Sequence, residues 1–398
     1  MQSINIWPQE PSIQGEKVKT GFIFEKTQDR RIIWYEIPIE FSSSLSKWCD
    51  PYVLAALFEA MNTPANLVIH GAVSPSLIDN LREFQIIWNA WFPKLYSPVE
   101  IIPDNELERS MPKHSNQLLA FSGGLDSCYA AWKFTRSDNI HLPYSSLTGL
   151  IINGYEFPPK YEDTFNRAVD KARIILDSVG MKLIPITTNL RTINQFQDNA
   201  GGAFLASCLM LFQEEFVSGL ISSSYPYSHL VLPYGSNPLT DRMMSSQTFS
   251  IIHGGAEATR IEKIAQIAEW PEAMQYMRVC LGREPSKRDN NCCRCEKCVR
   301  NILEFRALGF GLPPSFEKDI NIWQIIKLKY SYYTQLGNSY EDILTAIDTN
   351  HIHAAWVLAL KFTVIKNRAR INLERISWLN SLLRKIKNRL RIRRDFNA

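Results

Sequence analysis

Strand-like and helix-like stretches alternate through the middle of the chain. Short apolar runs, typical of buried strands, are each followed by a longer stretch with apolar residues at helical spacing. Strands are predicted at 118–121, 147–153, 183–187 and 220–223, and helices at 127–136, 162–179 and 203–216. This alternation predicts an α/β fold with a parallel sheet and right-handed crossovers, in which ligands bind at the carboxyl ends of the strands.

The residues before this alternation have a mixed pattern. Two strand-like runs at 18–26 and 30–41, separated by a polar turn, predict a β-hairpin. Helices are predicted at 51–61 and 74–91, with a strand at 65–71 between them. This α+β region contains no chemical motif. We expect it to pack against the α/β part of the chain and to complete it, with substrate recognition as the alternative.

The residues after the alternation are mainly helical in pattern. Near the end of the chain, apolar residues recur at spacings of three and four with arginine and lysine between them. They are Ile376, Leu379, Leu383, Ile386 and Leu390. This spacing predicts a basic amphipathic helix, which packs on the protein itself or on a second copy, or binds nucleic acid or a membrane surface. We therefore expect three parts: an N-terminal α+β region (1–110), an α/β domain (111–310) and a helical C-terminal region (311–398).

Composition and charge narrow the class of protein. The chain has 398 residues, of which 45% are hydrophobic and 21% charged, values typical of a globular protein of this length with two or three domains. No apolar run is long enough to span a bilayer, and the N-terminus lacks the features of a signal peptide, so we expect a cytoplasmic protein. The net charge is +4, but the charge is unevenly distributed, because twelve Lys and Arg residues lie in 361–398. Any affinity for a polyanion is expected there.

A pair of glycines follows the first strand of the alternation, in the string Ser122-Gly123-Gly124-Leu125-Asp126-Ser127. At a strand-to-helix junction, the first backbone N–H groups of the helix have no partner of their own and the helix dipole adds partial positive charge. Glycines let a phosphate approach the main chain, so the string predicts an anion-binding loop. The alternative is an ordinary turn, in which Gly124 supplies a positive φ and Asp126 or Ser127 caps the helix.

A cluster of cysteines forms a second motif. Cys292, Cys295 and Cys298 follow one another with two residues between each pair. Cys293 lies between the first two, and Cys280 lies twelve residues upstream of Cys292. Eight cysteines in a cytoplasmic protein favour metal or catalytic use over disulfides. Four thiolates match a structural zinc ion, with an iron–sulfur cluster or buried thiols as alternatives.

The string Ser-Gly-Gly-Leu-Asp-Ser resembles the pyrophosphate loop (PP-loop) of the N-type ATP pyrophosphatases, and it lacks the Lys-Ser/Thr ending of a Walker A loop. Together with the cysteine array it resembles the 7-cyano-7-deazaguanine synthase-like proteins, over roughly residues 111–310. The chain departs from that family in its two extra flanking regions and in Cys293, which stands where a glycine is usual. It therefore looks like a divergent and extended member.

The resemblance implies a Rossmann-like fold with ATP, Mg2+ and Zn2+ as cofactors. Phosphates would lie against Ser122, Gly123, Gly124, Leu125, Asp126 and Ser127, with the catalytic roles on Ser122, Asp126 and Ser127. Adenine would lie near Ile152 and Asn153, where a plain strand end is the alternative. Zinc would be held by Cys280, Cys292, Cys295 and Cys298.

A polar loop after a further apolar stretch is the expected substrate contact. Its candidate residues are Ser236, Asn237, Asp241 and Arg242, with turn capping and a surface ion pair as the alternative. Thr259 and Glu262 match a capping box, so Glu262 is expected to be structural. The sequence offers no partner motif for His114 or His253, so both are expected to be non-catalytic.

The function implied by the resemblance is that of an ATP-dependent C–N bond-forming ligase. The enzyme would adenylate a carboxylate or carbonyl oxygen of the substrate, for example a deazapurine, and release pyrophosphate. Ammonia or an amine would then attack the adenylate. Two alternatives stay open: a tRNA-modifying PP-loop enzyme of the thiolase or lysidine type, and a non-catalytic nucleotide-binding partner protein. A homodimer, and a nucleic acid or protein bound by the basic tail, are further partners to consider.

Overall fold

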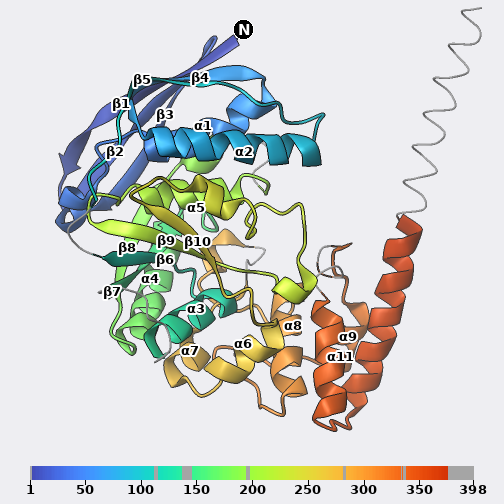
Figure 1. The fold of residues 1–398 in the computed structure, drawn as a ribbon. Helices are drawn as coiled ribbons and strands as arrows, with labels where there is room; N and C mark the ends of the chain where they lie inside the picture. Colours follow the sequence, from blue (N-terminus) through green and yellow to red (C-terminus); the bar gives the residue numbers. More distant parts are fainter. Residues whose placement is uncertain are drawn as a thin grey trace, which may run out of the picture. The chain divides into compact units, whose positions relative to one another are not determined.

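The structure is a computed structural model that describes residues 2–111, 115–136, 146–193, 198–280, 284–332, 334 and 338–374. The chain forms two compact units, Met1–Asn291 and Cys292–Ala398. The first unit contains one large sheet with helices on both faces, and the second is helical in its described residues (Figure 1).

The sheet of the first unit has ten strands, in the order β10-β9-β6-β7-β8-β3-β2-β1-β4-β5. The strands are β1 (Gln2–Gln14), β2 (Lys17–Lys26), β3 (Asp29–Pro38), β4 (Ala65–Val73), β5 (Ile101–Glu106), β6 (Asn116–Ala120), β7 (Ser146–Asn153), β8 (Lys182–Thr188), β9 (Phe216–Ser222) and β10 (Ser250–Gly254). All four strands predicted in the α/β part are confirmed as β6 to β9, and they pair in parallel. The pattern of apolar residues did not predict β1, β5 or β10.

The N-terminal hairpin joins the parallel strands edge to edge. β2 and β3 pair antiparallel as predicted. β3 then pairs antiparallel with β8, through Tyr35 opposite Thr188 and Glu36 opposite Thr187. The N-terminal α+β region therefore extends the same sheet, and the chain is a mixed α/β protein with a large, mostly parallel sheet. The domain boundaries at 110 and 310 stay predictions.

Helices cover both faces of this sheet. They are α1 (Asp50–Asn62), α2 (Pro75–Trp91), α3 (Leu125–Arg136), α4 (Glu162–Asp177), α5 (Gly201–Met210), α6 (Arg260–Ile267) and α7 (Pro271–Tyr276). α1, α2 and α5 lie between the two halves of the sheet, and α3, α4, α6 and α7 lie on the opposite side of the parallel half (Figure 1). α5 ends at Met210, before the predicted end at 216. Turns over 211–215 separate it from β9, which begins at Phe216.

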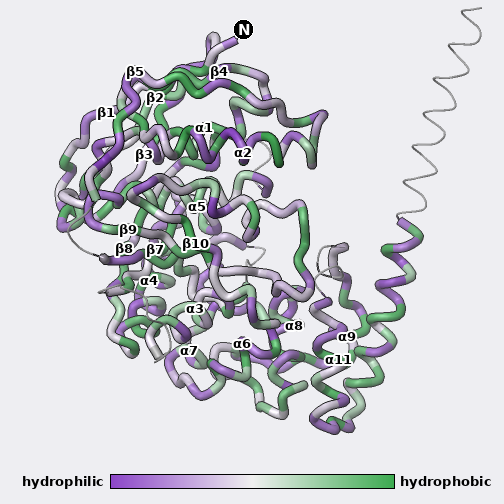
Figure 2. Tube along the Cα trace, viewed as in Figure 1, coloured by the Kyte–Doolittle hydropathy of each residue, from purple (hydrophilic) through white to green (hydrophobic). Residues whose placement is uncertain are grey.

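The apolar core explains this arrangement. Hydrophobic and hydrophilic residues alternate along α2 at helical spacing (Figure 2), and its buried face includes Leu77, Leu81 and Trp88. α1 is buried along almost its whole length, as expected for a helix covered on two sides. One apolar cluster runs from β1 to β10 through α1, α2 and α5.

The second unit is built from helices, as the sequence predicted. They are α8 (Glu296–Ala307), α9 (Ile322–Lys327), α11 (Ser339–Thr349) and a helix over 355–374. The predicted basic amphipathic helix, from Ile376 to Leu390, lies outside the described residues. Within the part of the chain that is described, we find no helix with the length and apolar character needed to cross a membrane.

Candidate functional site

The segment Ser122–Ser127, called the glycine loop here, connects the carboxyl end of β6 to the N-terminus of α3. Gly123 has a φ of +73°, so the left-handed residue is Gly123 and not Gly124, to which the alternative of an ordinary turn assigned it. The Ser127 hydroxyl donates to the Gly124 carbonyl at 3.0 Å and lies 3.4 Å from the Ser122 hydroxyl. The first N–H groups of α3 have no partner within the helix, so the loop offers an anion several donors.

Arg278 fastens the glycine loop from a distant part of the chain. Its backbone N–H donates to the Gly123 carbonyl at 2.8 Å, and its guanidinium donates to the Ser122 carbonyl at 3.0 Å. The same guanidinium pairs with Glu156 at 2.6 Å and lies over the Phe157 ring, 4.6 Å from its centroid. The Arg278 side chain is only 6% exposed, so its contacts with the loop are largely shielded from water.

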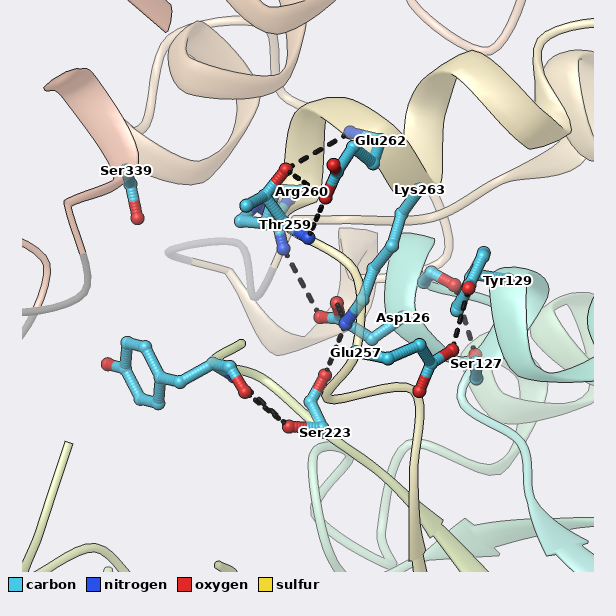
Figure 3. A network of polar contacts seen from close by, with 12 residues as sticks. Asp126, Ser127, Tyr129, Ser223, Glu257, Thr259, Arg260, Glu262, Lys263 and Ser339 are labelled. Carbon is cyan, nitrogen blue, oxygen red and sulfur yellow. Dashed lines mark hydrogen bonds and ion pairs between the residues drawn. The ribbon is translucent and has the colours of Figure 1, made fainter. Parts of the chain in front are cut away.

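Asp126, a residue of the glycine loop, is the centre of a charged cluster (Figure 3). Its carboxylate accepts from the Lys263 ammonium at 2.8 Å and from the Arg260 guanidinium at 3.2 Å, both on α6. Lys263 is 1% exposed, and it also donates to the Ser223 carbonyl at the end of β9, at 2.6 Å. The buried ammonium is therefore paired and hydrogen-bonded, as a charge in this position requires.

A second acidic group lies beside α3. Glu257 accepts from the Tyr129 hydroxyl at 2.8 Å (Figure 3). It also accepts from the Lys133 ammonium at 2.6 Å. Burial raises the pKa of Glu257, but the hydrogen bonds from Lys133 and Tyr129 outweigh it, and the net pKa is lowered. Cys128, directly after the loop, is fully buried, and burial raises the pKa of its thiol. A thiol in this state is a poor nucleophile.

Asn153 ends β7, the strand next to β6. It is 1% exposed, and among the described residues neither atom of its side-chain amide has a hydrogen-bond partner. Side chains alternate along a strand, so Asn153 lies on the same face as Gly149. A Cβ at Gly149 would touch Leu176 of α4 and the side chain of Phe121, directly before the glycine loop. Ile152, 9% exposed, faces the opposite side and packs in the large apolar cluster.

The predicted substrate loop is held by Asp241, which is completely buried. Its carboxylate accepts from the Ser236 hydroxyl at 2.7 Å and from the Asn237 backbone N–H at 3.1 Å. It also lies 2.8 Å from Nδ1 of His253, a partner for which the sequence offered no motif. Arg242 is exposed. Direct substrate contact by these four loop residues stays a prediction. His114 lies outside the described residues.

The four cysteines of the predicted metal site come together. Ligand atoms of Cys280, Cys292, Cys295 and Cys298 all lie within 4.8 Å of one another. The sulfurs of Cys292 and Cys298 are 3.9 Å apart. Tetrahedral zinc with bonds of about 2.3 Å requires sulfurs about 3.8 Å apart, so this donor set fits zinc and can hold it.

Cys293 is not part of this group. Its φ is +56°, a left-handed conformation that glycine adopts without strain and other residues rarely adopt. This backbone explains why glycine suits the position. The thiol is 5% exposed, and burial raises its pKa.

Three cations near the loop were missed by the sequence analysis: Arg260, Lys263 and Arg278. The capping box that begins α6 is confirmed, with Glu262 in the structural role predicted for it. Arg260 and Lys263 are the first and fourth residues of that helix, so a basic residue in the first turn of a capped helix was the available signal. Arg278 had no local signal, because its partners lie far away in sequence.

No protein-family model, curated protein or solved structure matches this chain.

Proposed function

We propose that this chain is an ATP-dependent ligase of the PP-loop type, with a Rossmann-like nucleotide-binding fold built on β6 to β9. It adenylates a substrate carboxylate, releases pyrophosphate, and transfers the acyl group to ammonia or an amine. The observation that carries the proposal is the unpartnered amide of Asn153, buried at the end of the strand beside the one that leads into the glycine loop.

Adenine supplies what this amide lacks. A buried donor and acceptor without partners cost about 1–3 kcal/mol each, so a ligand that satisfies both gains affinity. The adenine base offers an N–H donor beside a ring-nitrogen acceptor, and an asparagine amide pairs with such an edge through two hydrogen bonds. Ile152, the other predicted adenine contact, would contribute through its backbone.

The glycine loop suits the phosphates. Gly123 and Gly124 allow close approach of the main chain, and the N-terminus of α3 supplies N–H donors and partial positive charge. The hydroxyls of Ser122 and Ser127 would donate to phosphate oxygens. Arg260, 12% exposed and held by Asp126, would stabilise the negative charge of a departing pyrophosphate. Mg2+ would accompany the phosphates, and Asp126, held by Lys263 and Arg260, would orient the loop or the metal's shell.

The cysteine group would have a structural role. A closed set of four thiolates leaves no open position for a substrate, so zinc held there would stabilise the fold. Cys280 is two residues from Arg278, which fastens the glycine loop, so the metal site would also support the loop's conformation.

The proposed substrate class rests on the resemblance to 7-cyano-7-deazaguanine synthase-like proteins. A nitrile on a deazapurine arises from an amide, and the amide from a carboxylate, so the corresponding acid is 7-carboxy-7-deazaguanine. The thiolase alternative needs a reactive sulfur carrier near the loop, and the buried Cys128 does not suit that role.

Product analysis tests the proposal. Protein incubated with Mg–ATP, 7-carboxy-7-deazaguanine and ammonium should form AMP and pyrophosphate, and it should exchange labelled pyrophosphate into ATP when ammonium is omitted. Asp126→Asn and Ser122→Ala should lose both activities while keeping the metal. Formation of ADP and phosphate in a preparation free of contaminating ATPase would mean β–γ cleavage and would refute adenylation.

A further inference from the structure

His253 and Asp241 form a fixed pair at the carboxyl edge of the sheet. His253 is next to last in β10, and its Nδ1 lies 2.8 Å from an Asp241 carboxylate oxygen. The His253 side chain is 5% exposed and that of Asp241 is fully buried. Asp241 is itself held by Ser236 and by the backbone of Asn237. The carboxylate is therefore immobilised and can set the orientation of the imidazole ring.

This pairing decides which ring nitrogen is free. A carboxylate only accepts hydrogen bonds, so Nδ1 of His253 carries the proton and, in a neutral ring, Nε2 is the acceptor. Nε2 is buried, and no described residue donates to it. A buried acceptor without a donor is unfavourable, so the pair is suited to a ligand that brings an N–H or O–H group.

The pair lies on the same edge of the sheet as the glycine loop. β10 and β9 are parallel, and Ser223, directly after β9, donates from its backbone N–H to the Gly254 carbonyl at 2.7 Å. The Ser223 carbonyl in turn accepts from Lys263, which pairs with Asp126 of the loop. A continuous set of hydrogen bonds thus joins the residue after His253 to the loop, along the strand ends where α/β proteins bind ligands.

We propose that His253 is the general base for the amine in the transfer step, and that Asp241 is its positioning residue. This inference rests on the proposed adenylation. The amine nitrogen attacks the acyl carbon of the adenylate, the C–N bond forms, and the bond from carbon to the phosphate oxygen breaks, so that AMP leaves with the electron pair. The amine proton passes to Nε2 of His253. The imidazolium that results is stabilised by Asp241 and later releases its proton to solvent.

The test compares the two half-reactions in the same preparation. Pyrophosphate exchange with 7-carboxy-7-deazaguanine measures adenylation, and amide formation with ammonium chloride measures transfer. In His253→Gln the ratio of amide formation to exchange should fall about 10²- to 10⁴-fold, the range that general-base catalysis contributes. Asp241→Asn should lower the same ratio, because it no longer fixes the tautomer. His353→Gln, at an exposed site in the second unit, is the matched control.

The outcomes separate the two proposals. Wild-type protein without pyrophosphate exchange would refute adenylation, and the transfer role with it. Exchange in the wild type, together with an unchanged ratio in His253→Gln, would overturn the role of His253 alone. Melting temperature and metal content establish that the variants are folded.

A spectroscopic measurement covers the case in which His253→Gln fails to fold. In the wild-type chain labelled with 15N-histidine, the signals of His253 should show a protonated Nδ1 and an unprotonated Nε2. A proton found on Nε2 of the neutral ring would overturn the proposal. Addition of exogenous imidazole to His253→Ala should restore part of the amide formation, and an absence of rescue in a folded variant counts against a base at this position.

Discussion

The guanidinium of Arg278 donates a 3.0 Å hydrogen bond to the main-chain carbonyl of Ser122, while the backbone N–H of Arg278 donates to the neighbouring carbonyl of Gly123 at 2.8 Å. A residue more than 150 positions later in the chain thus holds the glycine loop through both its main chain and its side chain. The loop conformation is therefore a property of the folded unit, and loop geometry and fold stability should respond together to changes at Arg278.

Replacement of Arg278 by methionine tests this relationship. Arg278→Met should lower the free energy of unfolding by about 2–4 kcal/mol, because Glu156 loses its charged partner and the loop carbonyl loses a donor. Mg–ATP affinity should fall about tenfold, equivalent to about 1.4 kcal/mol. Urea unfolding and titration calorimetry measure the two effects.

Arg82→Met is the matched control. Arg82 lies on α2 in an exposed pair with Asp79, and such pairs contribute about 0–1 kcal/mol. An Arg278 variant as stable as the Arg82 variant, with unchanged nucleotide affinity, would contradict the fastening role.

Asn153 should give effects of opposite sign on stability and on binding. Asn153→Leu replaces an unpartnered buried amide by an apolar side chain of similar size. The free energy of unfolding should therefore stay the same or increase by about 1–3 kcal/mol. Mg–ATP affinity should nevertheless fall at least tenfold, because the contacts to adenine are lost. Calorimetry and thermal unfolding of the same samples measure both.

Asn66→Ala is the control for this substitution, since Asn66 bonds to Glu100 at an exposed site on β4. If Asn153→Leu destabilises the protein and binds ATP normally, the amide has a structural partner in solution and the adenine assignment is wrong.

The four-cysteine group should hold about one zinc ion per chain. Cys295→Ser should lose the metal and several kcal/mol of stability, because a structural zinc contributes folding free energy directly. A strong chelator should do the same to the wild type. Elemental analysis and the melting temperature are the measurements. Iron together with visible absorption would contradict the zinc assignment and indicate an iron–sulfur cluster.

Cys293→Gly is the matched control within the same segment. It should keep the metal, since Cys293 is outside the ligand group, and it should relieve a left-handed strain of about 1–2 kcal/mol that partly offsets the loss of a buried thiol. Loss of metal in this variant would show that Cys293 is a ligand.

The pairing of Glu257 predicts a dependence of stability on pH. Its pKa in the folded chain is lowered from the ordinary value of 4.5, so the group stabilises the fold above that value, and this contribution disappears as the pH falls through the folded-state pKa. Glu257→Gln should therefore be less stable than the wild type at pH 7, and the difference should shrink at pH 4 and below. Urea unfolding at both pH values measures it, and a difference that grows on acidification would contradict the assigned direction.

The sequence by itself determined the local structure and the two motifs. Apolar periodicity predicted β6 to β9 and the helices between them, because burial repeats every second residue in strands and every three to four in helices. The glycine string and the cysteine spacing were equally visible, since each depends on residues close together in the chain. β10 was missed because the run Ile251–Ile252 is too short to show a period.

Only the tertiary structure decided which distant residues meet. The pairing of Asp126 with Lys263, of Ser122 with Arg278 and of Asp241 with His253 depends on strand order and on how α6 and the substrate loop pack. The antiparallel contact of β3 with β8, which merges the N-terminal region into the same sheet, is of the same kind. Periodicity reports whether a residue is buried, whereas the partner of a buried charge is chosen by the whole fold, because only there do chain segments far apart in sequence exclude water together.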